Sequence, residues 1–117
     1  MREAKLTSLL FYFTEVKAES VWTPLTDIYQ TREGWLIKIE LAGVRPQDVS
    51  ISAQGGQFCI SGTRRDCTLE EGCSHYLLEI PYIRFERKIE LPSEVEAEAI
   101  KTEFQNGMLL LYVKRKQ

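Results

Sequence analysis

The sequence lacks the features that mark several large classes of protein. Its longest apolar run near the N-terminus, Leu9–Phe13, is far shorter than the about 20 residues of a membrane span. No small-residue cleavage site follows this run, so we expect a cytoplasmic protein. The three cysteines, Cys59, Cys67 and Cys73, are an odd number and too sparse for the disulfide framework of a small secreted domain, which also favours a reducing compartment.

A strong charge of either sign is also missing. Fifteen Lys and Arg residues face seventeen Asp and Glu residues, and the net charge is -2. No whole-chain field therefore draws the protein to nucleic acid or to an anionic membrane. The composition, 44% hydrophobic and 27% charged, is that of a globular domain, and 117 residues are enough for one domain.

The residues needed for catalysis or metal binding are scarce. A single histidine, His75, would have to serve any Ser/His or Cys/His pair. Cys67, Cys73 and His75 could donate to zinc, but their spacing lacks close pairs and a fourth ligand. No glycine-rich phosphate motif occurs. We therefore predict no enzymatic activity, no catalytic residue, no cofactor and no metal, while a disulfide between subunits through the polar loop remains an alternative.

The chain does contain two contrasting hydrophobic periods. In residues 1–20, apolar side chains recur every three or four positions, which predicts an amphipathic helix that is marginal by itself: Leu6, Leu9, Leu10, Phe13 and Val16. This N-terminal arm either packs on its own domain or binds a partner or client.

From Val21 onward the period is two, which is typical of strands with one face on a core. Short strands are predicted at 35–41, 49–53, 58–63, 85–91, 100–104 and 108–113, separated by turn residues such as Asn106–Gly107. His75–Ile80 is a further short apolar run before Pro81. Seven or eight strands without a second helical pattern predict an all-β fold, an antiparallel immunoglobulin-like β-sandwich over residues 21–117.

Five segments, in order, resemble the α-crystallin domain of small heat-shock proteins. They are Trp22–Tyr29, Glu40–Val44 followed by Asp48–Val49, Ile60–Arg64, Phe85–Pro92, and Ile100 through Leu109. Ala42 replaces the usual proline of the second segment, and Thr102 replaces the usual alanine of the last. In this family Gly43, Gly62, Gly107 and Leu109 are expected to have structural roles.

The resemblance implies an ATP-independent chaperone, a holdase that binds unfolding client proteins and suppresses their aggregation. It further implies a homodimer in which His75–Ile80 pairs with the partner's strand near Val21–Ile28. The implied interface residues are Trp22, Leu25, His75, Tyr76, Leu77, Leu78, Phe85 and Arg87. Arg87 shares the parity of Phe85 and Ile89, so its charge should find a carboxylate unless it extends to solvent.

Two apolar surfaces are candidates for client or partner binding. The first is the arm, through Leu6, Leu9, Leu10, Phe11 and Phe13, and the second is a groove lined by Val49, Ile51, Ile100 and Phe104. In the family this groove receives an I-x-I motif, and none follows the last predicted strand before Gln117. We therefore expect a dimer or a small oligomer.

Two other functions remain open. A co-chaperone of the CS-domain kind shares the sandwich architecture, although the strand Phe85–Leu91 with its Arg87 and the long loop weigh against it. A dimeric modulator that alters the assembly of a longer small heat-shock protein is the other alternative.

Overall fold

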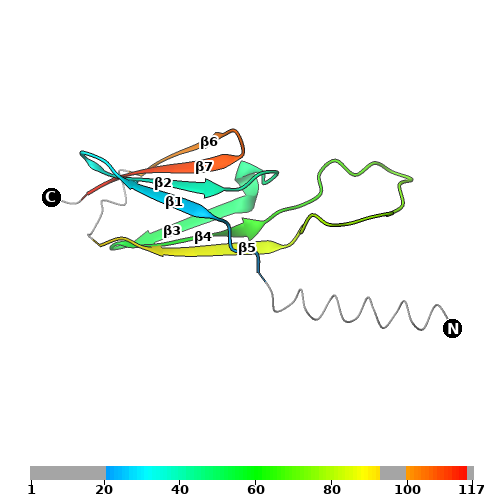
Figure 1. Cartoon of the computed structure of the whole chain (residues 1–117), viewed down its shortest axis with the longest axis horizontal. Coiled ribbons are helices and arrows are strands. Elements are labelled where there is room, and N and C mark those ends of the chain that lie inside the picture. The colour runs from blue at the N-terminus through cyan, green and yellow to red at the C-terminus, as the bar shows by residue number, and fades with distance from the viewer. Residues whose placement is uncertain (1–20, 93–99, 116–117) are drawn as a thin grey trace.

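The computed structural model describes residues 21–92 and 100–115, and these residues form a two-layered β-sandwich (Figure 1). Residues 1–20, with the predicted helical arm, lie outside the described residues, as do 93–99 and 116–117. The strands are β1 (Thr26–Gln30), β2 (Gly34–Glu40), β3 (Val49–Gln54), β4 (Gln57–Thr63), β5 (Arg84–Glu90), β6 (Lys101–Gln105) and β7 (Met108–Lys114). A short 3-10 turn, η1 (Pro46–Asp48), precedes β3.

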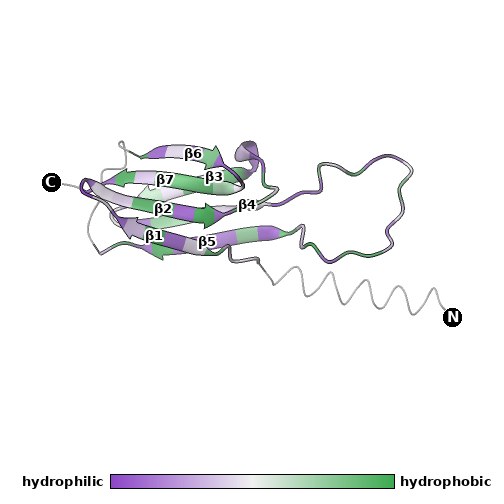
Figure 2. Ribbon diagram, turned by 45° about the horizontal axis from the view of Figure 1, so that its top comes forward, coloured by the Kyte–Doolittle hydropathy of each residue, from purple (hydrophilic) through white to green (hydrophobic). Residues whose placement is uncertain are grey.

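The strands divide between two antiparallel sheets. One sheet has the order β1-β2-β7-β6 and the other the order β3-β4-β5. The predicted all-β antiparallel sandwich is therefore confirmed. Each sheet has two edge strands, with β1 and β5 on one side of the sandwich and β3 and β6 on the other (Figures 1 and 2).

The core lies between the inward faces of the two sheets, where every second residue is apolar. The fully buried side chains are Ile37, Ile39, Leu41, Ile60, Phe85, Leu109 and Leu111, each at most 1% exposed. Burying one such side chain contributes about 1.5–3 kcal/mol before the loss of conformational entropy is subtracted. In the strands predicted at 35–41 and 85–91, the alternate apolar residues thus face the core, as the sequence pattern predicts.

The Asn106–Gly107 hairpin has the backbone that its sequence predicts. Asn106 has φ 53° and Gly107 has φ 76°, the positive pair that a type I′ turn requires. The Leu41 N–H donates to the Gly107 carbonyl at 2.8 Å. This hairpin joins β6 to β7, and the bond holds it against the end of β2.

Gly62 is required for a different reason, because β4 passes very close to its neighbours there. A Cβ atom at this position would lie 2.0 Å from the Asp48 carbonyl oxygen and 2.7 Å from Cζ of Phe85. The sandwich therefore has no room for any side chain at Gly62. Gly43, with φ 80°, lies in the turn after Leu41.

Three local features complete the description of the strands. β1 starts only at Thr26, so the first part of the family segment Trp22–Tyr29 lies outside the strand. The outward face of β7 is covered only in part, because Tyr112 is 38% exposed whereas Leu110 on the same face is buried. His75–Ile80 forms no strand within the single chain, and its pairing with a partner subunit stays a prediction.

Candidate partner-binding surfaces

The long loop between β4 and β5, residues 64–83, extends away from the end of the sandwich (Figure 1). Residues 65–82 are all exposed, and hydrophobic residues recur along the loop (Figure 2). The largest exposed apolar side chains are Leu69 (57%), Tyr76 (102%), Leu77 (70%), Leu78 (65%) and Ile80 (59%). Such a contiguous run of exposed apolar residues is typical of an interaction surface.

The edge of β1 is a second surface with uncovered apolar residues. Leu25 is 72% exposed and Tyr29 is 47% exposed. Ile28 pairs with the buried Ile37 and so has inward parity, yet it is 41% exposed. The core therefore does not extend under β1, and the backbone groups on the outer side of this edge strand have no partner strand in the described chain.

Trp22 lies between β1 and β5 and connects the two sheets. Its N–H donates to the Arg84 carbonyl at 2.9 Å, and its carbonyl accepts from the Glu86 N–H at 3.0 Å. The indole meets the Phe85 ring edge-on, with the ring centroids 5.7 Å apart. Phe85 itself is 0% exposed, so its side chain belongs to the chain's own core.

Arg87 lies on β5 with the inward parity that its sequence position predicts. It pairs with Ile60, which is completely buried. Its Nε atom is buried and has no hydrogen-bond partner in residues 21–92 and 100–115. The carboxylate expected for Arg87 is therefore not supplied by the described part of this chain, which leaves an inward-facing cation on an edge strand.

The opposite side of the sandwich carries the other predicted apolar set. Val49 and Ile51 of β3 and Ile100 before β6 are half-buried and pack against the core. Phe104 pairs with Leu109 and so has inward parity, but it is 37% exposed. These four residues therefore lie on the edge strands β3 and β6 or, for Ile100, directly before β6, and they present an incompletely covered apolar margin.

The root of the long loop contains an arginine whose role the sequence did not reveal. Both Nε and Nη2 of Arg64 donate to the Pro81 carbonyl, at 3.1 and 3.0 Å, and Nη1 donates to the Ala42 carbonyl at 3.2 Å. Its guanidinium carbon lies 3.9 Å from the centroid of the Trp22 ring. In the sequence Arg64 is only the last residue of the family segment Ile60–Arg64, and the sequence does not indicate that it contacts Pro81, Ala42 and Trp22.

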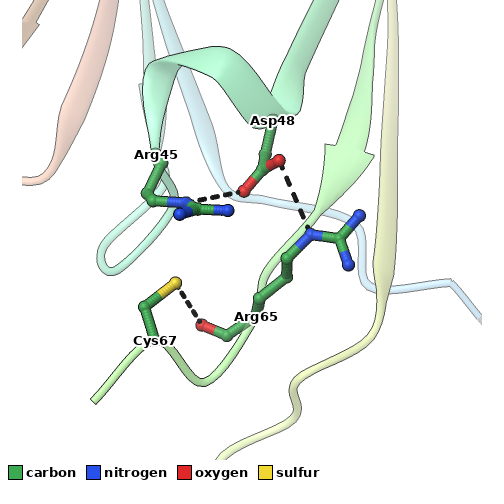
Figure 3. Close-up of polar contacts among 4 residues, drawn as sticks. All are labelled: Arg45, Asp48, Arg65 and Cys67. Atoms are coloured by element: carbon green, nitrogen blue, oxygen red, sulfur yellow. Dashed lines mark hydrogen bonds and ion pairs between the residues drawn. The ribbon is translucent and has the colours of Figure 1, made fainter.

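The next residue, Arg65, pairs with a different part of the molecule (Figure 3). Its Nε lies 3.5 Å from Oδ1 of Asp48, whose other oxygen lies 3.1 Å from Nε of Arg45. The hydrogen bond to the Asp48 carboxylate, followed by its negative charge, raises the pKa of Arg45 above its ordinary value. Cys67 lies beside this cluster, with Sγ 3.6 Å from the Arg65 carbonyl oxygen.

The described part of the chain contains three cysteines and other potential metal ligands. Cys59, Cys67 and Cys73 are free thiols. Residues 21–92 and 100–115 contain no group of three His, Cys, Asp or Glu side chains that could hold a metal ion. Among the same residues, no helix is long and apolar enough to cross a membrane.

The arrangement of strands, the long β4–β5 loop and the ordered sequence motifs can now be compared with known proteins. A family model described as the Hsp20/alpha crystallin family matches residues 27–117. The chain belongs to the Hsp20/alpha crystallin family. The small heat-shock protein resemblance found in the sequence is therefore confirmed.

Among the family's curated members, Small heat shock protein C2 of Rickettsia felis is 30% identical over 94 residues, covering 80% of this chain and 61% of the relative. Spore protein SP21 of Stigmatella aurantiaca is 26% identical over 100 residues, covering 86% and 59%. The chain thus spans about three fifths of the length of these relatives.

Solved structures of small heat-shock proteins share the fold. Heat shock protein 16.0 of Schizosaccharomyces pombe superposes with a TM-score of 0.73 at 24% identity, covering 80% of this chain and 87% of that one. The hspA protein of Xanthomonas axonopodis gives a TM-score of 0.69 at 24% identity, covering 83% and 97%. These Hsp20-family structures establish the sandwich architecture of the chain.

Proposed function

We propose that this Hsp20-family chain is an ATP-independent holdase that works as a homodimer, formed when two copies exchange the segment His75–Ile80. The observation that carries the proposal is the exposed apolar loop beside an uncovered strand edge. We name His75–Ile80 the exchange segment. Binding of unfolding clients then occurs in the cytoplasm, on apolar surfaces that the dimer leaves open.

The exposure of the exchange segment supports dimerisation. Tyr76, Leu77 and Leu78 have no covering neighbour in the described chain, and apolar surface removed from water contributes about 25 cal/mol per Å². The edge of β1 offers unpaired backbone groups and its own exposed Leu25 and Tyr29. A strand added to this edge satisfies the backbone of both copies and covers both apolar sets.

The state of Arg87 supports the same geometry. Its buried Nε requires an acceptor, and a buried N–H without one costs about 1–3 kcal/mol. Glu79 lies within the exchange segment and is exposed in the single chain. We infer that Glu79 of the partner subunit reaches Arg87 in the dimer and forms the ion pair that the single chain lacks.

Capture of clients requires apolar surface that remains open after dimerisation. The margin formed by Val49, Ile51, Ile100 and Phe104 meets this requirement, because it lies on the side of the sandwich away from β1 and β5. The arm, with Leu6, Leu9, Leu10, Phe11 and Phe13, is the second proposed client surface.

The dimer is tested by sedimentation velocity over a range of concentrations. Replacing Leu77 and Leu78 together by serine should convert the dimer to monomer, since both side chains lie in the exchange segment. Leu69→Ser is the matched control, because Leu69 is similarly exposed in the same loop but lies outside that segment. Equal effects of the two replacements, or no effect of either, would contradict strand exchange.

Holdase activity is tested by light scattering from a heat-denatured client protein in the absence of ATP. The chain should suppress the scattering at roughly stoichiometric amounts. Phe104→Ser should weaken the suppression without changing the dimer, because Phe104 is on the opposite margin. Scattering that rises equally with and without the chain would exclude the holdase function.

A further inference from the structure

Arg64 connects three parts of the molecule that are distant in sequence. Its main-chain N–H donates to the Ile83 carbonyl at 3.0 Å, and its side chain donates to the Pro81 carbonyl. The outgoing and returning ends of the loop are thereby fastened to each other across seventeen positions. The third donor of the guanidinium goes to the Ala42 carbonyl, in the turn that follows β2.

The fourth contact of Arg64 is with Trp22. The guanidinium carbon lies 3.9 Å from the centroid of the indole ring, well within the range of a cation–π interaction. The backbone of Trp22 is itself bonded to Arg84 and Glu86 of β5. One planar group, carried by the outgoing end of the loop, therefore contacts the returning end at Pro81, the turn after β2 at Ala42, and the ring of Trp22.

The stem of Arg64 lies beside the turn that contains Gly43. A Cβ placed on Gly43 would lie 3.6 Å from Cδ of Arg64, which is an ordinary van der Waals distance. Arg65 is fastened separately, through Asp48, so the two adjacent arginines hold the start of the loop at different contacts (Figure 3). The loop beyond them, residues 65–82, is exposed throughout.

We propose that Arg64 is the positioning residue of the loop, a clamp that fixes the direction in which the loop leaves the sandwich and couples that direction to the placement of Trp22. A loop of this length without secondary structure samples many directions unless its root is held. Fixing the root lowers the entropic cost of placing the exchange segment on a second copy. This effect on dimerisation rests on the proposed strand exchange, whereas the coupling to Trp22 does not.

The clamp requires the shape of arginine as well as its charge. A guanidinium presents donors in a planar fork and can stack on an aromatic ring at the same time. An ammonium is a point charge on a flexible stem and cannot cover Trp22 while donating to Pro81 and Ala42. Arg64→Lys keeps the positive charge at the root of the loop but removes the planar guanidinium. This variant therefore tests whether the shape of arginine is required in addition to its charge.

The test compares Arg64→Ala and Arg64→Lys with Arg65→Ala in the full chain. Arg65 is an adjacent arginine with one carboxylate partner and a 59% exposed side chain, so it is a matched control. The first measurement is hydrogen exchange at the amides of Trp22 and Glu86, made by NMR at a dilution where the chain is monomeric. Exchange at both amides should be roughly tenfold faster in both Arg64 variants, about 1.4 kcal/mol, and unchanged in Arg65→Ala.

The second measurement is the dimer dissociation constant by sedimentation. It should rise roughly tenfold in the Arg64 variants and less than about twofold in Arg65→Ala. If the wild-type chain is monomeric at every concentration, strand exchange fails, but the amide exchange still decides the coupling to Trp22. Amide exchange in Arg64→Lys that equals wild type, or that matches Arg65→Ala, would overturn the clamp, and this variant remains informative if Arg64→Ala fails to fold.

Discussion

Replacing Arg87 by methionine should have opposite effects on the monomer and on the dimer. In the single chain the buried Nε of Arg87 has no described partner, which costs about 1–3 kcal/mol. Methionine keeps an unbranched stem beside Ile60 and removes the unsatisfied N–H. We therefore expect the monomer to gain about 1 kcal/mol of stability, and its thermal midpoint to rise by roughly 4–8 °C for a domain of this size.

In the proposed dimer the same replacement should leave Glu79 of the partner subunit without its cation. The dissociation constant should then rise about tenfold or more, which corresponds to about 1.4 kcal/mol per factor of ten. Urea denaturation at low concentration measures the first effect, and sedimentation measures the second. Arg84→Met is the control, because Arg84 is an exposed arginine on the same strand. A monomer that loses stability together with an unchanged dimer would refute this reasoning.

Three further predictions test the sandwich itself. Gly62→Ala should destabilise the fold by about 3 kcal/mol or more, because its Cβ would overlap the Asp48 carbonyl and Phe85. The control Gly55→Ala, with φ 65° but nothing within 4 Å, should cost only about 1–2 kcal/mol. Thermal unfolding that shows Gly55→Ala to be the more destabilising of the two would contradict the close approach at Gly62. Gly107→Val should lower the thermal midpoint, since φ 76° is strained for a β-branched residue; an unchanged midpoint would exclude the type I′ hairpin. Asp48→Ala should cost less than about 1 kcal/mol in urea, because both of its ion pairs involve exposed arginines.

The alternation of apolar residues was sufficient to predict the core. Ile37, Ile39 and Leu41 follow a period of two, and a half-buried strand has only one way to place such a pattern. The Asn106–Gly107 turn was predictable because few residue pairs accept two positive φ values. These features depend on neighbours along the chain, which a sequence displays directly.

The contacts of Arg64 and the crossing of Trp22 to β5 were not predictable in this way. Each depends on carbonyl groups brought close by folding, such as that of Pro81, and a carbonyl group is present at every residue. The exposure of Ile28 was missed for a related reason, because parity says which face a residue occupies but not how far the opposite sheet extends. Edge strands are where such pattern arguments fail.

The contacts of Trp22 make the two open sides of the sandwich differ in the kind of interaction that joins the sheets. On the side of β1 and β5, main-chain hydrogen bonds at Trp22 tie the first sheet's leading segment to the second sheet. On the side of β3 and β6, apolar side chains such as Val49 and Ile51 pack against the core, and Phe104 is 37% exposed. We therefore expect thermal fluctuations to separate the two sheets along β3 and β6 before they separate them at Trp22. Heating should then expose more of the apolar margin that we propose for clients before it disturbs the edge that we propose for the second copy.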